Sequence, residues 1–305
     1  NGKTIAHEFT TVYRSKPLSR WRLRPPKMEP WFRSERMPVK RAAYNHAPAC
    51  ITVGPNGMLY IGSGSRTDAG EINGRVGENA TGDRGLTASI WRLSTDAPLM
   101  FEVFAEGFRN PFGLVFDEAG NLYATENGPD KDAPEELNRV ERGKHYGFPF
   151  QFGDLAENPY TRTPKAAPGT SLELPMLNLG PDGRGAGAKD EGSFAAHSCP
   201  LGLAALDASF PAPWGKGLLV SRFGNLVKVE TGDVGFDILH VQPLAEKDGR
   251  EPFVCKTFVT GLGRPIDVVA GSSNEVYIAE YTRGTSTADG LGLPGRILVL
   301  RPKTR

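Results

Sequence analysis

The sequence predicts an all-β protein made of repeated antiparallel sheets, and three observations lead to this prediction. Glycine and proline are frequent, with 37 and 25 of the 305 residues, and they are scattered as single turn residues. Three segments align with one another without gaps as two short strands around a turn. Further strand-like segments follow these hairpins. Units of about 60 or more residues with four strands each are typical of the blades of a β-propeller.

The aligned hairpins share an apolar first strand, a turn with Gly or Asn, and a tyrosine at one position of the second strand. They read ITVGPNGMLYIGSG from Ile51, LVFDEAGNLYATEN from Leu114 and VVAGSSNEVYIAEY from Val268. A looser fourth copy begins at Gly202. A β-sandwich with chance similarity is the alternative, but sandwiches do not repeat a fixed tyrosine and a fixed proline at the start of each hairpin.

The remaining strands of each unit are also visible in the sequence. Third strands are expected at SIWRLS, ELNRVE, NLVKVE and GRILVL, and fourth strands at MFEVFAEG and CKTFVTGL. We therefore expect residues 1–305 to form a single propeller domain. Residues 1–45 are atypical, with one strand-like piece, TIAHEFTTVYR, and no hairpin. Residues 150–200 are expected to form a long irregular connection.

Charge and cysteine content exclude several classes of function. The 36 basic and 35 acidic residues nearly cancel, which argues against nucleic acid or a membrane surface as the main partner. No apolar run reaches the roughly 18 residues that a membrane helix needs, so we expect no membrane span. The three cysteines lack CxxC spacing, so a zinc ribbon or covalently bound haem is not expected. Three cysteines can form at most one disulfide.

The repeat predicts which polar residues meet at one rim of the propeller channel. In each blade, the residues before the first strand and after the second strand converge on the same face. The alignment places His46 level with Arg109, Arg264 beside Asn110, and His197 nearby. Arg222 and the pair Glu126–Asn127 follow second strands. An arginine cluster suits a ligand with several carboxylates, and a histidine among arginines suits a general base.

A cation site is expected after the second hairpin. Asp130, Asp132, Glu135 and Glu136 follow a Gly-Pro turn, and such an oxygen-rich group suits a hard cation such as calcium. The spacing is not that of an EF-hand. A solvated acidic loop is the alternative for these residues, just as a local surface ion pair is the alternative for a single arginine such as Arg222.

Two segments carry a family resemblance. RNPFGLVFDEAGNLYATENGP, followed by EELNRVERGKHYGFP, resembles the motif pair of the soluble quinoprotein (PQQ-dependent) glucose and sorbosone dehydrogenases, also called aldose sugar dehydrogenases. HAPACITVGPNGMLYIGSG resembles the blade that carries their catalytic histidine. The resemblance covers Asn45 to Pro149 strongly and Pro200 to Pro302 more weakly. It implies a six-bladed propeller and an oxidoreductase that transfers hydride from the anomeric or primary hydroxyl of a sugar to calcium-bound PQQ.

The resemblance also implies roles for individual residues. His46 would be the general base, and Arg109 and Asn110 would contact the cofactor and the substrate. Arg222 and Arg264 would hold the cofactor carboxylates. The carbonyls of Gly128 and Pro129 would bind the calcium that polarises the quinone. Three further residues, Glu135, Glu136 and Tyr146, match a second, structural calcium site of some members.

Three departures from the family pattern stand in this sequence. Asn45 stands where some members have Asp, and Ile266 stands where a second cofactor-binding Arg is expected. The family's first blade is not recognisable before His46. Two alternatives therefore stay open, a non-catalytic propeller that binds other molecules and a calcium-dependent lactonase, although a lactonase would not need the arginines. We further expect a sugar substrate, a separate electron acceptor, and a periplasmic or secreted location.

Overall fold

The computed structural model describes residues 7–16, 26–38, 46–70, 83, 85–155, 159–160, 164–181, 193–228 and 232–302. Their regular structure is β, apart from one short 3₁₀ turn, Thr287–Asp289. No helix in this part of the chain is long and apolar enough to cross a membrane. Asn45 and the sequence around it, from residue 39, lie outside the described residues.

Four sheets repeat the predicted unit. The first contains β5 (Pro48–Val53), β6 (Leu59–Ser63), β7 (Ser89–Leu93) and β8 (Phe101–Glu106). The second contains β9 (Pro111–Phe116), β10 (Leu122–Glu126) and β11 (Glu136–Val140). The third contains β13 (Pro200–Leu206), β14 (Gly217–Arg222), β15 (Asp237–Pro243) and β16 (Pro252–Val259), with β12 (Leu177–Pro181) parallel to β16. The fourth contains β17 (Pro265–Ala270), β18 (Val276–Glu280) and β19 (Arg296–Leu300).

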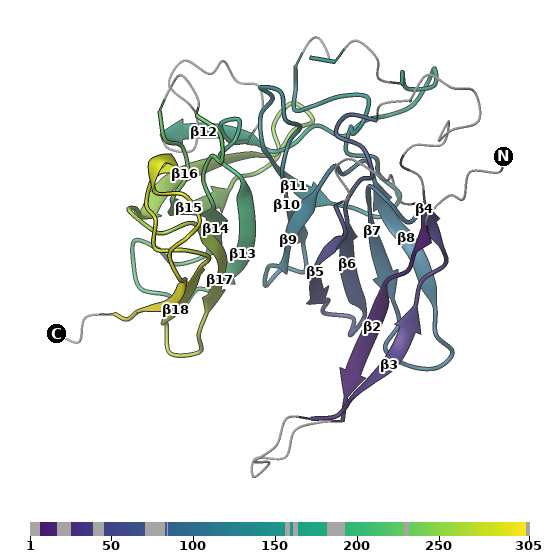
Figure 1. The fold of residues 1–305 in the computed structure, drawn as a ribbon, viewed down its shortest axis with the longest axis horizontal. Coiled ribbons are helices and arrows are strands. Elements are labelled where there is room, and N and C mark those ends of the chain that lie inside the picture. Colours follow the sequence, from purple (N-terminus) through teal and green to yellow (C-terminus); the bar gives the residue numbers. More distant parts are fainter. Residues whose placement is uncertain are drawn as a thin grey trace.

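The first strands of the four sheets lie side by side. β5 contacts β9, β9 contacts β13, and β13 contacts β17, as the series across Figure 1 shows. Each of these strands begins with a proline and pairs antiparallel with the next strand of its own sheet. Proline suits the first position of a strand because no ladder hydrogen bond from its nitrogen is needed there. The inner strands therefore all start at one rim, as the repeat predicted.

The tyrosine that recurs in the hairpins is buried between neighbouring sheets in the first two sheets but exposed in the fourth. Tyr60 and Tyr123 pair with equivalent residues of their inner strands and are buried in the cores between neighbouring sheets. Tyr277 has the same register in the fourth sheet but is 39% exposed. Val269 and Ile297, on the same face, are exposed as well. This face therefore presents apolar side chains to solvent.

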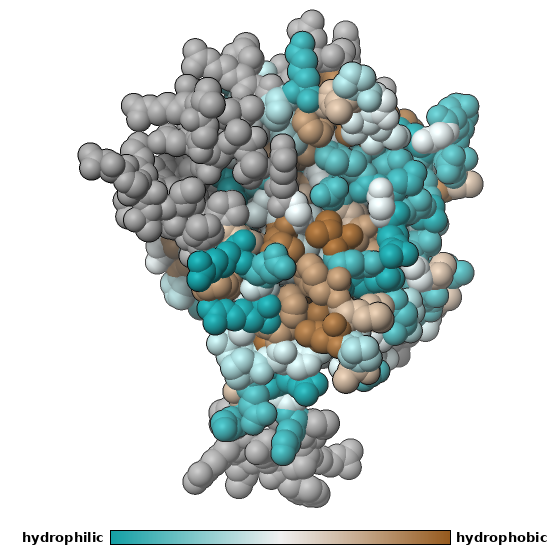
Figure 2. Space-filling view, turned by 90° about the vertical axis from the view of Figure 1, so that its right-hand side faces the viewer, coloured by the Kyte–Doolittle hydropathy of each residue, from teal (hydrophilic) through white to brown (hydrophobic). Residues whose placement is uncertain are grey.

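The N-terminal segment forms two small pairings. β2 (Thr11–Ser15) pairs antiparallel with β3 (Met28–Arg33), and β1 (His7–Glu8) pairs with β4 (Met37–Pro38). The expectation that residues 1–45 contain no hairpin is wrong, because β2 and β3 form an antiparallel pair. Phe32 of β3 stacks on Phe101 of β8, which joins this pair to the first sheet. Figure 2 shows this side of the molecule, where apolar atoms are surrounded by hydrophilic ones.

One further expectation is corrected. NLVKVE is not the third strand of its unit: the Asn225 side chain binds the backbone of Val227 and Val234 and holds the described residues 225–228 in a loop. That strand is β15 instead. Of the six blades implied by the resemblance, the described residues form four, with three to five strands each. All three cysteines are free, which is consistent with the expectation of at most one disulfide.

Candidate active site

Backbone hydrogen bonds assemble the rim from equivalent positions of the four sheets. In three of the sheets, the carbonyl of the residue before the first-strand proline accepts a hydrogen bond from a backbone N–H just after the second strand. The donor and acceptor residues are Asn127 and Asn110 (3.2 Å), Phe223 and Cys199 (2.9 Å), and Tyr281 and Arg264 (3.0 Å). In the first sheet, His46 N–H donates to the Ser65 carbonyl (2.9 Å). The fold therefore brings residues more than 200 positions apart in sequence to one rim, where the alignment placed them.

His46 lies against Arg109, as predicted. The Ser65 N–H donates to the Arg109 carbonyl (2.7 Å), and Ser65 in turn accepts from His46, so one residue joins the two. Arg66 donates from Nη1 to the His46 carbonyl (2.7 Å) and forms an ion pair with Glu8. Arg66 follows the second strand of the first sheet, and it fixes the backbone of the candidate base.

The imidazole of His46 is neutral at physiological pH. Burial, together with the positive charges of Arg109 and Arg66, lowers its pKa to about 4, although the negative charge of Asp68 partly opposes them. The ordinary histidine pKa of about 6.5 would have left a sizeable protonated fraction near neutrality. A neutral ring can accept a proton, which is the state a general base needs.

Asp68 organises this part of the rim and was missed by the sequence. Its Oδ1 accepts hydrogen bonds from Arg109 Nε (3.1 Å), Arg109 Nη2 (2.6 Å) and the Asp130 N–H (3.1 Å). Its Oδ2 accepts a hydrogen bond from the Tyr160 hydroxyl. The only signal in the sequence was its place three residues after Ser65, and nothing there indicated a partner in the long connection.

Three buried glutamates lie close together, and the charge of Arg109 acts on two of them, Glu126 and Glu135. Glu126 and Glu136 are opposite one another on β10 and β11, and Glu135 precedes β11. Burial raises the pKa of Glu126 and Glu135 and brings that of Glu136 to about 7, and the mutual repulsion of the carboxylates acts in the same direction. Glu126 Oε1 accepts from the Arg109 N–H, while its buried Oε2 has no hydrogen-bond partner among the described residues.

The residues predicted to bind calcium fall into two places. Glu135 Oε2 accepts from the Gly128 N–H (2.6 Å), so Glu135, Gly128 and the adjoining Pro129 lie together. Next to them, the buried Asn127 Oδ1 has no hydrogen-bond partner among the described residues. Within the described ranges, no group of three or more His, Cys, Asp and Glu side chains has metal-binding geometry. A cation at this turn would therefore also need carbonyl oxygens.

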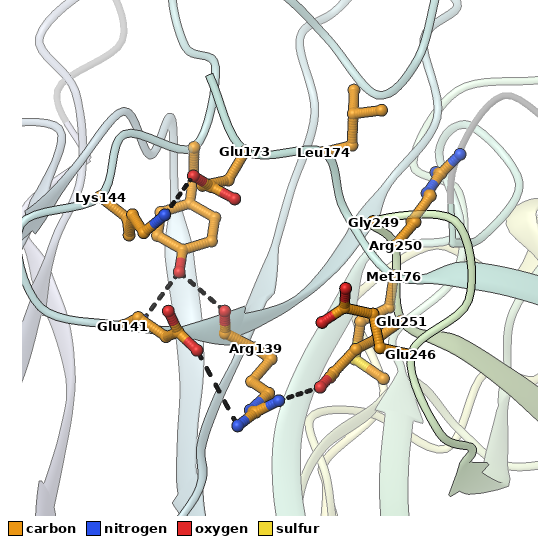
Figure 3. A pocket seen from close by; sticks show the side chains of 11 residues that line it. Arg139, Glu141, Lys144, Glu173, Leu174, Met176, Glu246, Gly249, Arg250 and Glu251 are labelled. Carbon is orange, nitrogen blue, oxygen red and sulfur yellow. Dashed lines mark hydrogen bonds and ion pairs between the residues drawn. The ribbon is translucent and has the colours of Figure 1, made fainter. Parts of the chain in front are cut away.

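The Tyr146 hydroxyl lies elsewhere, at the other end of β11. It donates to the Arg139 carbonyl (2.7 Å) and accepts from the Glu141 N–H (2.8 Å). Tyr146 lines a pocket of about 280 Å³, in which Arg139 stands between Glu141 and Glu251 and Lys144 faces Glu173 (Figure 3). The hydroxyl does not reach the Glu135–Glu136 end of the strand. Ion pairs neutralise the cations shown there.

The third and fourth sheets supply two arginines of different character. Arg222 donates from Nε and Nη2 to both oxygens of Asp237 (2.8 and 2.5 Å), a buried two-pronged ion pair. Arg264 is 1% exposed and donates to the carbonyls of Gly224 and Asn225 (both 3.1 Å). Its guanidinium lies over the rings of Phe223 and Phe236, 5.1 and 4.8 Å from their centroids. Among the described residues, no carboxylate forms an ion pair with it.

Cys199 stands between the two halves of the rim. It occupies the position before Pro200 that Asn110 and Arg264 occupy in their sheets. Burial and the nearby Glu135 raise the pKa of its thiol, while Arg109 and Arg264 lower it. Arg109 and Arg264 therefore both lie close enough to the Cys199 thiol to affect its pKa. The proline repeat could have identified this position, but the sequence alignment stopped at His197, whose Nε2 lies 2.8 Å from Asp132 Oδ1.

The donor set fits an anionic quinone and a hard cation. Arg264 offers a buried positive charge without an ion-paired carboxylate among the described residues, although Asp233 and Asp289 act on it from a greater distance. Asn127 and Glu126 offer buried oxygens without hydrogen-bond partners among the described residues. Arg109 and Arg222 are already paired with Asp68 and Asp237. Arg264 is therefore the arginine best suited to a ligand carboxylate, and the turn at Asn127–Pro129 is the best place for calcium.

Comparison with known proteins supports this view of the fold. The family model for glucose/sorbosone dehydrogenases matches residues 18–176, slightly more than half of the chain. No curated protein sequence matches. A solved glucose dehydrogenase aligns with 96% of this chain and 73% of its own, at 20% identity and a TM-score of 0.62.

Two further solved structures have the same fold. The PQQ-bound form of an aldose sugar dehydrogenase from Streptomyces coelicolor aligns with 95% of this chain and 70% of its own, with 20% identity and a TM-score of 0.55. The apo form of the soluble aldose sugar dehydrogenase from Escherichia coli aligns with 90% and 69%, with 17% identity and a TM-score of 0.56. These similarities establish the propeller fold predicted from the repeat.

Proposed function

The chain belongs to the glucose/sorbosone dehydrogenase family, and on this premise we propose that it oxidises the anomeric or primary hydroxyl of a sugar with PQQ and calcium as cofactors. The resemblance seen in the motifs and the prediction of a sugar dehydrogenase are confirmed by that membership. One observation carries the finer proposal: a neutral, largely buried histidine lies against the Arg109–Asp68 ion pair at the rim of the channel.

The residues that would hold the cofactors follow from their charges. Arg264 would bind a carboxylate of PQQ, because its charge has no carboxylate partner among the described residues. The carbonyls of Gly128 and Pro129, with Asn127 Oδ1, would bind calcium. Glu135 would orient this turn through the Gly128 N–H. When bound, PQQ with its calcium would supply an acceptor for the hydride that leaves the sugar carbon.

His46 would accept the proton of the sugar hydroxyl. Its ring is uncharged above a pH of about 4, so it needs no prior deprotonation near neutrality. Arg109 and Asn110, at the start of the next sheet, would orient the sugar oxygens, and Asp68 fixes the direction of the Arg109 guanidinium. Accepting a proton creates an imidazolium beside two arginines, and the Asp68 carboxylate would offset that charge.

The test compares two histidine variants of protein reconstituted with PQQ and calcium. His46→Ala is expected to keep cofactor binding by calorimetry while dye-coupled aldose oxidation falls by about 10²–10⁴, the range for loss of a general base. His197→Ala is the control, because its ring pairs with Asp132 away from His46. If His197→Ala loses the rate and His46→Ala keeps it, the assignment of the base is wrong.

Calorimetry also separates the alternatives. Wild-type protein that binds no PQQ in millimolar calcium would favour a non-catalytic propeller, and a calcium-dependent hydrolytic activity would favour a lactonase. We further propose that a separate protein or small molecule accepts the electrons, and that the protein acts in the periplasm or outside the cell. The absence of a CxxCH motif, as read from the sequence, supports a separate acceptor.

A further inference from the structure

We propose that Tyr160, on the long connection after the second sheet, is a positioning residue that sets the orientation of Arg109 through Asp68. This inference rests on the proposed function for its catalytic consequence, but its structural part does not. The Tyr160 hydroxyl donates to Asp68 Oδ2, and Asp68 Oδ1 accepts both Arg109 Nε and Nη2. The three side chains therefore form one chain of hydrogen bonds from the connection to the rim.

Each oxygen of Asp68 has a separate task. Oδ1 also accepts the Asp130 N–H (3.1 Å), so it is fully used by the rim. Oδ2 receives the tyrosine hydroxyl from the opposite direction. A carboxylate can rotate about its terminal torsion at little cost, because that torsion is broad. The hydroxyl restrains this rotation and keeps Oδ1 directed at the guanidinium.

Tyr160 is itself held from several sides. Its oxygen accepts the Lys131 N–H (3.0 Å), and the Lys131 ammonium lies 4.9 Å from its ring centroid and donates to the Pro159 carbonyl (2.8 Å). Its ring contacts that of Phe152, with centroids 5.9 Å apart, in a cluster with Ala69 and Ala133. The hydroxyl is thus presented to Asp68 by a packed ring rather than by a free side chain.

The consequence concerns the candidate catalytic pair. Arg109 and Asp68 shift the pKa of His46 in opposite directions, so both charges lie close to the imidazole. A rotation of Asp68 would change the direction in which Arg109 presents its donors to a substrate oxygen. Orientation of this kind affects the turnover step more than ground-state binding.

The experiment uses Tyr160→Phe, which removes the hydroxyl and keeps the ring contacts, with Tyr60→Phe as the control. The Tyr60 hydroxyl is also bonded, to Asn56 (3.1 Å), at the far end of its hairpin from the rim. In the reconstituted enzyme we expect Tyr160→Phe to lower kcat by about tenfold with KM within about twofold, on the scale of one misplaced hydrogen bond. Tyr60→Phe should leave both constants unchanged.

Two further measurements decide the outcome. In an Asp68→Asn background, Tyr160→Phe should have little additional effect on kcat, because the two residues act as a unit; independent, additive losses would overturn the proposal. In protein without cofactor, the Arg109 Nε–H resonance should shift and exchange faster in Tyr160→Phe but not in Tyr60→Phe. An unchanged resonance would also overturn it. This second readout holds even if the proposed dehydrogenase activity is not found.

Discussion

Arg109 of the second sheet and Arg264 of the fourth have nearly the same burial, 4% and 1% exposed, but their partners differ in kind. Arg109 faces the carboxylates of Asp68 and Asp130. Arg264 faces two carbonyls and two aromatic rings. A carboxylate neutralises a guanidinium, whereas carbonyls and rings solvate it and leave its charge in place.

The difference teaches which arginine can bind an anion and which one maintains geometry. A buried charge without a counterion is costly, so it is retained where a ligand supplies the opposite charge. Arg222 resembles Arg109, since Asp237 satisfies it from both sides. The arginine cluster expected from the sequence is therefore two internal ion pairs and one candidate anchor for a cofactor carboxylate.

The largest expected effect contrasts two substitutions of the same chemistry. Arg222→Met leaves Asp237 buried without its partner and should lower the free energy of unfolding by about 3–5 kcal/mol. Arg264→Met strands no carboxylate, so it should change the free energy of unfolding by much less. It should instead weaken PQQ binding by about 1.5–3 kcal/mol, the scale of a charged hydrogen bond.

Urea unfolding and calorimetry measure the two quantities side by side. Equal losses of stability in both variants would mean that Arg264 is as structural as Arg222, and the contrast between the two kinds of arginine would fail. PQQ affinity unchanged in Arg264→Met would remove this residue from the cofactor site while leaving the propeller unaffected.

The repeats allowed the rim to be predicted, because its residues are tied to the pattern. The prolines that begin the inner strands recur at one position of the repeat, so the sequence alone places His46, Arg109 and Arg264 on one rim. Asp68 and Tyr160 could not be paired, because they are 92 residues apart and one lies in a connection without periodicity. The alternation of apolar residues in NLVKVE also misled, since Asn225 turns that segment into a loop.

The next effect concerns pH at the His46 end. With an ordinary pKa of about 6.5, only about 3% of the imidazole would be neutral at pH 5, whereas a pKa of about 4 leaves about 90% neutral. The rate of sugar oxidation should therefore fall only slightly between pH 7 and pH 5, rather than by about 25-fold. Profiles of kcat/KM against pH, which report the free enzyme, measure this directly. A decline centred near pH 6.5 would show that the base is not buried as described.

The smallest effect concerns the three buried glutamates, Glu126, Glu135 and Glu136. The pKa of the Glu136 carboxyl, about 7 in the folded protein, exceeds its unfolded value, so the folded state binds more protons between about pH 4.5 and 7. Stability without calcium should therefore fall as pH rises through this window. Calcium can replace the proton, so it should raise the melting temperature by a few degrees at pH 8 and less at pH 5.

The equivalent glutamate of the fourth sheet provides the internal control. Glu280 accepts from the Gly263 N–H as Glu126 accepts from Arg109, but Arg296 neutralises it. Glu280→Gln should leave the calcium-dependent rise in melting temperature intact, and Glu126→Gln should reduce it. If chelation and calcium loading give the same melting curve at pH 8, these carboxyls bind no cation.

The exposed face of the fourth sheet has a consequence for how the protein behaves in concentrated solution. Val269, Tyr277 and Ile297 lie on one side of β17–β19, in contact with water. Burial of one such side chain is worth about 1.5–3 kcal/mol, so contact between two of these faces would be favourable. Sulfate and phosphate strengthen apolar burial because they are excluded from protein surfaces. These salts should therefore promote association through this face, and a single lysine in place of Ile297 should extend the range of salt in which the protein stays dissolved.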